Sequence, residues 1–322
     1  MRASNGCLRC ADDAGASRNG ERGVKVCVVV DTYPGMHARW SGAERMGQRL
    51  GEGLSAAGHT VRFLTRPPDA GFACAAGTVC ARQGLAGAGW LTRHLPLDAV
   101  AMGSVLGQLR RLRPDVVHSF AKDLHFPTLA ACGVLRIPLV FTVVDQYLFC
   151  PTQTLALPGG QVCDARAGAA CERCFELVEG NIRNAVVRRL ARRSGLVRAF
   201  LELRARLAAW GARRLDAVIV LSEASRKRVL DLGVATERTH RIYLYDVATP
   251  ATPAEPFPEP TVVYIGALSA ARGADVAVRV MARVAARTPQ ARLKMVGAVW
   301  DDYGKMILQL PARLGIADRV EF

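Results

Sequence analysis

The segment that decides the fold is VKVCVVVDTYPGMHARWSGAERMGQRLGEGLSAAGHTVRFLT, which spans residues 24–65. An apolar run at 24–30 is followed by a glycine-containing turn, a helical pattern at 42–57 and a second apolar run, TVRFLT, at 60–65. Two strands separated by a helix are typical of a β-α-β unit, whose strands run parallel in one sheet. This segment therefore predicts a parallel sheet that is wound with helices.

The same alternation of strand and helix patterns continues along the chain. After residue 65 the expected elements are, in order, a helix around 98–112, a strand in DVVHSF at 115–120, a helix at 127–135, a strand in PLVFTVV at 138–144, a strand in DAVIVLS at 216–222, a helix in EASRKRVLDLG at 223–233 and a strand in RIYLY at 241–245. The chain is therefore expected to be an α/β protein with doubly wound parallel sheets.

Composition divides the chain into four parts. Residues 1–23 are polar and lack the apolar stretch of a secretory signal, so we expect a disordered leader. Residues 24–245 are expected to form a first domain, and the proline-rich segment DVATPATPAEPFPEP at 246–260 is typical of a linker. The pattern restarts at 261–322, but a piece of 62 residues buries only about 60% of its surface. We expect this last part to be an incomplete second domain.

The formal net charge of +15 is concentrated in one part of the chain. Basic helices are expected at 180–214, and from Ile182 to Arg214 there are ten arginines and one glutamate. Apolar residues recur there at the spacing of one helical face. That face consists of Leu196, Phe200, Leu203, Leu207 and Trp210. We expect an amphipathic helix whose apolar face packs inward.

Three interpretations of this basic helix stay open. The arginines form an ordinary solvated face, or they attach the protein to anionic lipid, where each basic side chain contributes about 1 kcal/mol. Lipid contact would involve Arg188, Arg189, Arg192, Arg193 and Arg198. Nucleic acid is the weakest interpretation, and no such partner is expected, because no stacking platform accompanies the charge.

Targeting segments do not stand out in the sequence. No apolar run approaches the roughly 20 residues that a membrane-spanning helix needs. The leader at 1–23 has no apolar stretch of the kind that secretory signals contain. We therefore expect a cytoplasmic protein, either free or peripheral at the inner face of the membrane.

Five stretches resemble the retaining glycosyltransferases of family 4, whose GT-B architecture consists of two Rossmann-like domains. In the first stretch a glycine-rich loop leads into a Gly-Ala-Glu helix start, and a Gly-His-x-Val turn leads into the second strand. The matching residues are Gly42, Ala43, Glu44, Gly58, His59 and Val61. The other stretches are RPDVVHSF at 113–120, IPLVFTVVDQYLFCP at 137–151, DAVIVLSEASRKRVLDLG at 216–233 and YIGALSAARGADVAVRVM at 264–281.

The resemblance implies a set of site residues. Ligands of wound α/β sheets bind at the carboxyl ends of strands, where backbone amides and helix N-termini offer donors. The expected donor-binding residues are Gly42, Gly266, Arg272 and Gly273, the expected acceptor-side residues are Glu44 and His118, and the expected catalytic residue is Asp145. Glu44 is equally explained as a helix-capping residue, and His118 as a structural hydrogen-bonding residue.

Three positions depart from the family pattern. Ala267 stands where members usually carry a second arginine, which removes one charge-assisted hydrogen bond worth about 1.5–3 kcal/mol. Val144 replaces the histidine of the usual His-Asp pair, so that Asp145 remains without it. The resemblance also implies a Glu-x7-Glu segment that meets the donor sugar and ribose, and its expected place lies beyond Phe322. The 322-residue chain is therefore expected to be inactive by itself.

The chain contains ten cysteines, and without a signal peptide we expect them to be reduced. Four of them form C-x12-C-x7-C-x2-C in an insertion at 150–174, and many bacterial family members carry a similar insertion. These are Cys150, Cys163, Cys171 and Cys174. Structural zinc is the expected occupant; unmetallated thiols and an iron–sulfur or redox site stay open. Cys27 and Cys132 are expected to be buried small hydrophobic residues.

The function implied by the resemblance is transfer of a sugar from a nucleotide-diphosphate sugar to a saccharide or lipid-linked acceptor, in the synthesis of cell-surface polysaccharide or glycolipid. No metal or cofactor is expected at the reaction centre, because basic side chains and helix N-termini neutralise the leaving diphosphate. The alternative is a non-catalytic, degenerate member that acts as an interaction or regulatory protein. A nicotinamide-dependent oxidoreductase is disfavoured because neither opening strand is followed by G-x-G-x-x-G.

Overall fold

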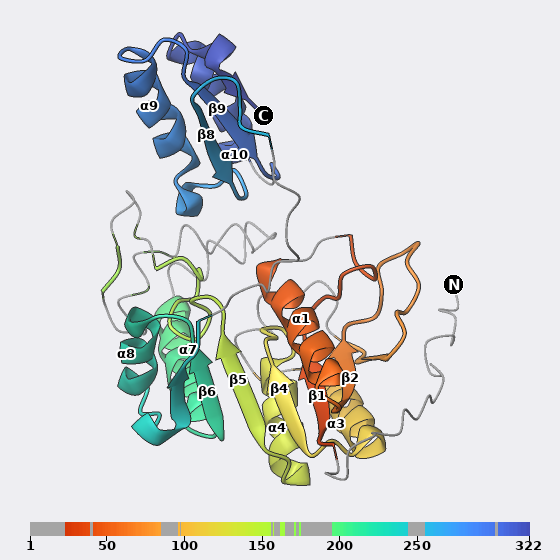
Figure 1. Ribbon diagram of the computed structural model, residues 1–322. Coiled ribbons are helices and arrows are strands. Elements are labelled where there is room, and N and C mark those ends of the chain that lie inside the picture. The colour runs from red at the N-terminus through yellow and green to blue at the C-terminus, as the bar shows by residue number, and fades with distance from the viewer. Residues whose placement is uncertain are drawn as a thin grey trace. The chain divides into compact units, whose positions relative to one another are not determined.

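The structure is a computed structural model that describes residues 23–38, 41–84, 96, 98–155, 157, 162–164, 171, 174, 195–243, 255–299 and 302–322. The chain divides into two compact units. Residues 1–158 with 163–246 form the first unit, and residues 159–162 with 247–322 form the second. Each unit contains a parallel sheet with helices (Figure 1).

The first unit contains a seven-stranded parallel sheet in the order β3-β2-β1-β4-β5-β6-β7. Its strands are β1 (Lys25–Val29), β2 (Thr60–Thr65), β3 (Thr78–Cys80), β4 (Val116–Ser119), β5 (Leu139–Val143), β6 (Ala217–Val220) and β7 (Thr239–Arg241). The described helices are α1 (Gly42–Ala56), α3 (Ala99–Leu112), α4 (His125–Leu135), α7 (Leu196–Ala212), α8 (Glu223–Asp231) and the 3-10 helix η3 (Thr236–Arg238). The expected α/β class and wound parallel sheet are confirmed.

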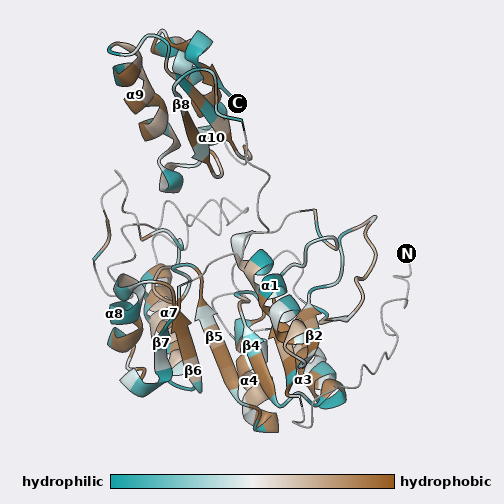
Figure 2. Cartoon of the chain, in the orientation of Figure 1, coloured by the Kyte–Doolittle hydropathy of each residue, from teal (hydrophilic) through white to brown (hydrophobic). Residues whose placement is uncertain are grey.

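Both faces of this sheet are covered, which explains why its strands have nearly continuous apolar sequences. One core cluster includes Val29 and Leu109 and lies between the sheet and the helices α3 and α4. A second cluster includes Val28 and Phe63 and lies under α1. Figure 2 shows hydrophobic residues along the strands and hydrophilic residues on the helices α1 and α8. Alternate residues of each strand therefore belong to the two separate core clusters on opposite faces of the sheet.

The direction of the winding reverses between β1 and β4. From β1 the chain continues to β2 and β3 at one edge of the sheet, then returns to β4 and proceeds to β7 at the other edge. Ligands of such sheets bind beside this reversal, at the carboxyl ends of the strands. The residues that follow β1, β4 and β5 are therefore the natural place for a site.

Two strands differ from the sequence-based expectation. The strand β3 was not foreseen, because three residues give too short a pattern to recognise. The strand expected at 241–245 lies earlier, at Thr239–Arg241, and residues 244–245 lie outside the described part of the chain. The apolar residues Ile242 and Tyr243 follow the end of β7 and are 50% and 62% exposed instead of packed in a strand.

The predicted inward face of α7 is wrong by about one residue. Leu203 and Trp210 are 49% and 42% exposed. The buried residues of this helix are Val197, Leu201, Arg204, Ala208, Gly211 and Ala212. A Cβ on Gly211 would lie 3.2 Å from Leu129 Cδ2 in α4. The helix thus approaches α4 through its small residues. Of the predicted inward face, Phe200 and Leu207 are partly buried against core clusters, whereas Leu203 and Trp210 turn outward. Arg188, Arg189, Arg192 and Arg193 lie outside the described residues.

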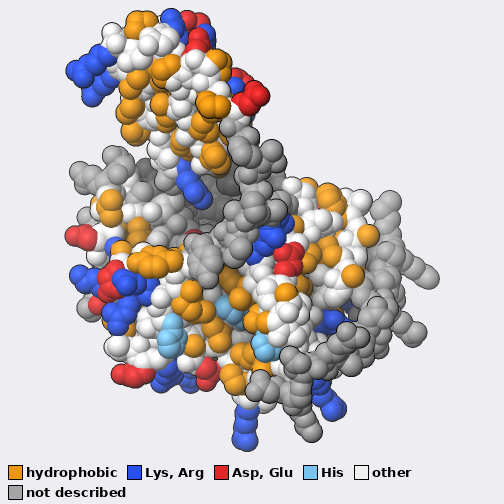
Figure 3. Space-filling model, viewed as in Figure 1, with side chains coloured by type: hydrophobic (Ala, Val, Ile, Leu, Met, Phe, Trp, Pro, Cys, Tyr) orange, Lys and Arg blue, Asp and Glu red, His pale blue; other side chains and the backbone are white. Residues whose placement is uncertain are grey.

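The second unit contains a three-stranded parallel sheet in the order β10-β9-β8. Its elements are β8 (Thr261–Ile265), η4 (Ala270–Arg272), α9 (Ala274–Ala285), β9 (Arg292–Val296), α10 (Asp302–Arg313), η5 (Ala317–Arg319) and β10 (Val320–Glu321). Val278, Met281 and Ile307 form the centre of its core with the buried residues of β9. Ile265 and Val296 are 80% and 58% exposed, and Figure 3 shows hydrophobic side chains on the surface of this unit.

Among the helices that the structure describes, none is both long enough and apolar enough to cross a lipid bilayer.

Candidate functional site

Three side chains gather at the carboxyl ends of neighbouring strands in the first unit. Asp31 follows β1, Lys122 follows β4 and Asp145 follows β5. Lys122 Nζ lies 2.9 Å from Asp145 Oδ2, and the Lys122 N–H donates to Asp31 Oδ2 at 2.7 Å. Lys122 therefore links the two carboxylates, one through its backbone and the other through its side chain.

Asp31 is a buried carboxylate held by the turn that follows β4. Its Oδ1 accepts hydrogen bonds from the N–H groups of Asp123 at 2.9 Å and Leu124 at 3.2 Å. Burial, followed by repulsion from the Asp123 carboxylate, raises the pKa of Asp31 to about 7, while the amide hydrogen bonds and the Lys122 charge oppose the shift. Asp31 thus fixes the backbone from which Lys122 reaches Asp145.

The Lys122–Asp145 ion pair is partly buried and has further hydrogen-bonding partners. The two side chains are 24% and 29% exposed. Lys122 Nζ also donates to Gln153 Oε1 at 3.1 Å, and Asp145 Oδ1 accepts from the Tyr147 N–H at 2.8 Å. The pair is held in place on both sides and still has an accessible surface on which a ligand can bind.

His118 lies within β4, one residue before the end of the strand. Its Nε2 is 2.7 Å from Thr142 Oγ1, and its ring stacks on Phe120 with centroids 4.8 Å apart. Burial lowers the pKa of His118 to about 4, so the imidazole is neutral near pH 7. These contacts explain His118 as a structural residue, and its expected acceptor contact stays a prediction.

Glu44 closes a capping box at the start of α1. The N–H and the hydroxyl of Ser41 donate to Glu44 Oε2 at 2.8 and 2.5 Å. Glu44 is therefore used to satisfy the helix N-terminus, which was one of its two expected roles. Gly42 is the first residue of the helix, and a Cβ there would meet no atom within 4 Å.

The other expected donor-binding residues lie together after β8 in the second unit. Gly266 has φ +151° and Gly273 has φ +66°, backbone conformations that favour glycine. The Tyr264 hydroxyl donates to Ala267 O at 2.9 Å and lies 3.5 Å from Arg272 O. Arg272 is exposed and directly precedes Gly273 and the N-terminus of α9. Tyr264 therefore holds the turn that presents the arginine.

The sequence profile of Glycosyltransferase Family 4 matches residues 40–244, more than half of the chain. The chain belongs to glycosyltransferase family 4. No curated protein sequence matches it. The match covers the ends of β4 and β5, so Lys122 and Asp145 lie within the matched region.

Solved structures share the fold of this family 4 member at low sequence identity. Anabaena HepE in complex with UDP-glucose is 16% identical with a TM-score of 0.57, over 93% of this chain and 68% of that one. A sucrose-phosphate synthase from Thermosynechococcus elongatus is 16% identical with a TM-score of 0.56, over 93% and 70%. A glycosyltransferase from Rickettsia africae is 12% identical with a TM-score of 0.55, over 94% and 68%. The expected GT-B-like fold class is thereby confirmed.

The four cysteines of the insertion are not gathered into a metal centre. In the described residues, which include all four, no group of three or more His, Cys, Asp or Glu side chains is placed to hold a metal ion. Cys150 and Cys171 both lie near the buried Arg204, whose guanidinium donates to Tyr147 O. Cys163 O accepts from Arg228 Nη2 at 2.8 Å. Zinc at these cysteines stays a prediction.

The two remaining cysteines with an expected role are placed as foreseen. Cys27 and Cys132 are 1% and 2% exposed and belong to the hydrophobic core. Burial raises the pKa of the Cys27 thiol far above its usual range, and it raises that of Cys132 to about 12. Both side chains are therefore inert thiols at neutral pH.

Sequence reasoning missed Asp31, Lys122 and Tyr264. Asp31 directly follows the first apolar run, and Lys122 follows the run in DVVHSF. A charged residue directly after a buried strand, or within a few residues of its end, is a signal for an edge site, and it was available for both residues. Tyr264 lies within a strand. Nothing in the sequence shows that its hydroxyl hydrogen-bonds the turn at Ala267, as opposed to that of an ordinary core tyrosine.

Proposed function

We propose that the protein is a retaining, nucleotide-sugar-dependent transferase that glycosylates a saccharide or a lipid-linked acceptor during synthesis of a cell-surface polysaccharide or glycolipid. Membership of family 4 supports sugar transfer. The fold shared with HepE, whose structure contains UDP-glucose, supports a nucleoside-diphosphate donor. The observation that carries the proposal is the Lys122–Asp145 pair, which offers a positioned carboxylate at the carboxyl edge of the first sheet.

In the proposed reaction the second unit binds the donor diphosphate. The Arg272 guanidinium and the N-terminus of α9 offer positive charge and hydrogen-bond donors at the end of β8. Stabilising the negative charge on the departing diphosphate favours breakage of the bond between the sugar's anomeric carbon and the diphosphate oxygen, while an acceptor hydroxyl loses its proton and forms the new glycosidic bond. Ala267 supplies no second cation there. We therefore expect Arg272→Gln to weaken donor binding by about tenfold or more, because one charge-assisted hydrogen bond is worth about 1.5–3 kcal/mol.

The proposed role of the first unit is to orient the sugar that reacts. Asp145 can accept a hydrogen bond from a sugar hydroxyl through an oxygen near the ammonium of Lys122. The Tyr147 N–H fixes the other carboxylate oxygen. A group whose position is fixed before binding contributes more to the transition state than one that must be reorganised.

The test is the release of nucleoside diphosphate and the formation of glycosylated product by the full-length gene product. UDP-, GDP- and ADP-sugars are each offered with a lipid-linked saccharide acceptor, and the anomeric configuration of the product is read by NMR spectroscopy. We expect turnover with one nucleotide class and retention of configuration. Donor binding without turnover of any donor would favour the second candidate, a non-catalytic member, which the replacements Ala267 and Val144 support.

A membrane-facing surface is part of the proposal. Leu203 and Trp210 of α7 face outward, and Trp210 lines a groove of about 690 Å³ with Val134, Arg136 and Arg214. The Arg214 guanidinium lies 4.1 Å from the centre of the Trp210 ring. Tryptophan beside arginine suits the interface of an anionic bilayer. We expect salt-sensitive binding to anionic but not neutral vesicles, and its loss in Leu203→Ser with Trp210→Ser.

Zinc in the cysteine insertion also stays a proposal. Burial disfavours the Cys150 thiolate, but the Thr152 hydroxyl and nearby backbone amides outweigh it, so the pKa of Cys150 is lowered. A thiolate is the form that binds zinc. Elemental analysis of reduced protein purified without chelator should find about one zinc, lost in Cys171→Ser with Cys174→Ser. Metal-free wild-type protein would refute the proposal.

A further inference from the structure

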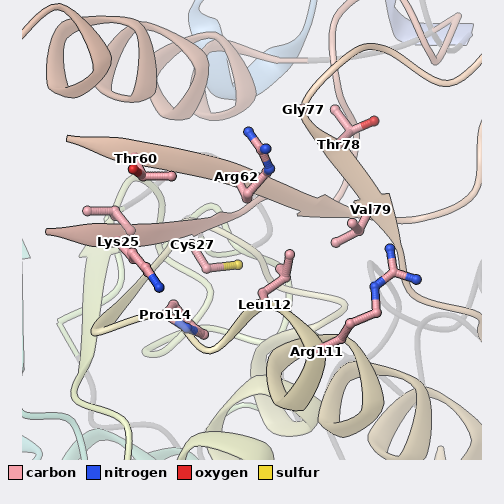
Figure 4. A pocket seen from close by; sticks show the side chains of 11 residues that line it. Lys25, Cys27, Thr60, Arg62, Gly77, Thr78, Val79, Arg111, Leu112 and Pro114 are labelled. Carbon is pink, nitrogen blue, oxygen red and sulfur yellow. The ribbon is translucent and has the colours of Figure 1, made fainter. Parts of the chain in front are cut away.

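A cavity of about 230 Å³ lies in the first unit at the amino ends of β1 and β2, next to β3 and the end of α3. Lys25 and Cys27 line it from β1, Thr60 and Arg62 from β2, and Arg111 from α3. Figure 4 shows Arg111 extending from the helix toward β3, while the other four side chains project from the two strands. The cavity therefore lies between a sheet face and a helix and is open to solvent, since Lys25, Thr60 and Arg111 are exposed.

The strand register places two of the three cations on one face of the sheet. Lys25 pairs with Thr60, and Cys27 pairs with Arg62, in the parallel ladder between β1 and β2. Paired residues of parallel strands project to the same face. Lys25, Cys27, Thr60 and Arg62 therefore share the face on which Arg111 approaches from the end of α3.

The charge of this cavity has one sign. Among the residues that the structure describes, none that lines the cavity is Asp or Glu, and no ion pair involves Lys25 or Arg62. The nearby Asp115 carboxylate accepts the Lys25 N–H at 2.8 Å but does not line the cavity. Cavities with low-dielectric walls and charges of one sign concentrate counter-ions.

Offsetting the carbonyl groups at the end of α3 is an ordinary role for Arg111, which lies in the last turn of that helix. It does not account for Lys25 and Arg62, which belong to the first two strands. Two cations from separate strands and a third from a helix, all lining one cavity, fit a multiply charged anion of small size.

We propose that this cavity binds a small phosphate-bearing molecule, with Lys25, Arg62 and Arg111 as its cationic ligands and the Thr60 hydroxyl as a further donor. Lys25 begins β1, whereas Lys122 and Asp145 follow the ends of the parallel strands β4 and β5, so the cavity and the Lys122–Asp145 pair lie at opposite edges of the same sheet. The cavity is therefore a second site, separate from the one at which sugar transfer is proposed.

The test is isothermal titration calorimetry of the whole protein with inorganic phosphate, diphosphate and glucose 1-phosphate, each at constant ionic strength set with chloride. We expect saturable binding of at least one of the three. Lys25→Gln and Arg62→Gln should each weaken it by about tenfold or more, since each removes a charge-assisted hydrogen bond. The order of the three affinities identifies whether free phosphate, diphosphate or a phosphate monoester is preferred.

Two control variants show whether the anion binds in this cavity or at another basic surface of the protein. Arg49→Gln removes an exposed arginine that pairs with Glu52, and Arg272→Gln removes the proposed donor contact in the second unit. Arg49→Gln should bind the anion as the wild type does, whereas Arg272→Gln reports any anion that binds at the donor turn instead. Circular dichroism should show all four variants folded. No saturable binding, unchanged binding in Lys25→Gln and Arg62→Gln, or an equal loss in Arg49→Gln would overturn the proposal. Loss confined to Arg272→Gln would do so as well, because it places the anion at the donor turn.

Discussion

Lys122 Nζ and Asp145 Oδ2 lie 2.9 Å apart although their residues follow different strands, β4 and β5. The contact depends on a third strand end, because Asp31 after β1 accepts the Lys122 N–H. A single turn of backbone therefore connects a buried carboxylate to an accessible one. The arrangement lies where the winding of the sheet reverses, the position at which such sheets bind ligands.

Asp31 gives the stability of the protein a distinct dependence on pH. Its pKa is raised from 3.8 to about 7, so between these values the folded state holds a proton that the unfolded chain has lost. The contribution of Asp31 is fully present below about pH 4 and is lost as the pH rises to about 7. Asp31→Asn removes this contribution.

The free energy of unfolding, measured with urea from pH 4 to pH 8, tests this dependence. When the two curves are aligned at pH 4, the free energy of unfolding of the wild type should fall below that of Asp31→Asn. The difference should grow as the pH rises to 7. The slope is the readout, because the asparagine also loses amide hydrogen bonds at every pH. Parallel curves would show that Asp31 ionises normally in the folded state.

His125 should have the opposite effect. It is 2% exposed, packs among Phe126, Phe141 and Tyr147, and its Nε2 has no hydrogen-bond partner in the described structure. Burial lowers the pKa of His125 from 6.5 to about 4, so stability is lost as the pH falls through that window. His125→Phe should flatten the acid limb of the unfolding curve. The pKa of His118 is lowered to about 4 as well, so His118 still makes stability fall as the pH falls in the His125→Phe variant. The substitution should therefore reduce the slope without removing it.

Two glycines of α1 should respond differently to the same substitution. A Cβ on Gly51 would collide with the Phe63 ring, whereas a Cβ on Gly53 would meet nothing within 4 Å. Gly51→Ala should therefore destabilise the protein by about 1–3 kcal/mol. Gly53→Ala should stabilise it by about 0.5–1 kcal/mol through helix propensity. Thermal unfolding of both variants measures the difference, and equal effects would contradict the packing of α1 on β2.

The sheet could be predicted because its strands are buried on both faces, and continuous apolar runs such as 24–30 and 138–144 reveal such strands directly. The orientation of α7 could not. Its sequence contains two stripes at helical spacing, and the buried one is set by the close approach of Gly211 to α4. A tertiary contact, which the hydrophobic pattern does not record, decided between them.

The candidate site could be predicted only in part. Asp145 and the turn at Arg272 were found through the family resemblance, because they belong to motifs that stand in one piece in the sequence. The Lys122–Asp145 pair depends on which strands are neighbours, and the three hydrogen bonds from backbone N–H groups to Asp31 depend on the turn after β4. Such contacts between distant residues follow from the strand order and not from local sequence.

The most direct test of the central claim compares the rate of sugar transfer by Asp145→Asn and Lys122→Gln with that of the wild type in the full-length gene product. At saturating donor, kcat should fall by about 100-fold for Asp145→Asn, as expected when one positioned group that contacts the transition state is lost. It should fall less for Lys122→Gln, which only disturbs that group. Arg49→Gln, which alters an exposed arginine far from the strand ends in sequence, should match the wild type. Wild-type turnover in Asp145→Asn would contradict the assignment of the reaction to this edge of the sheet.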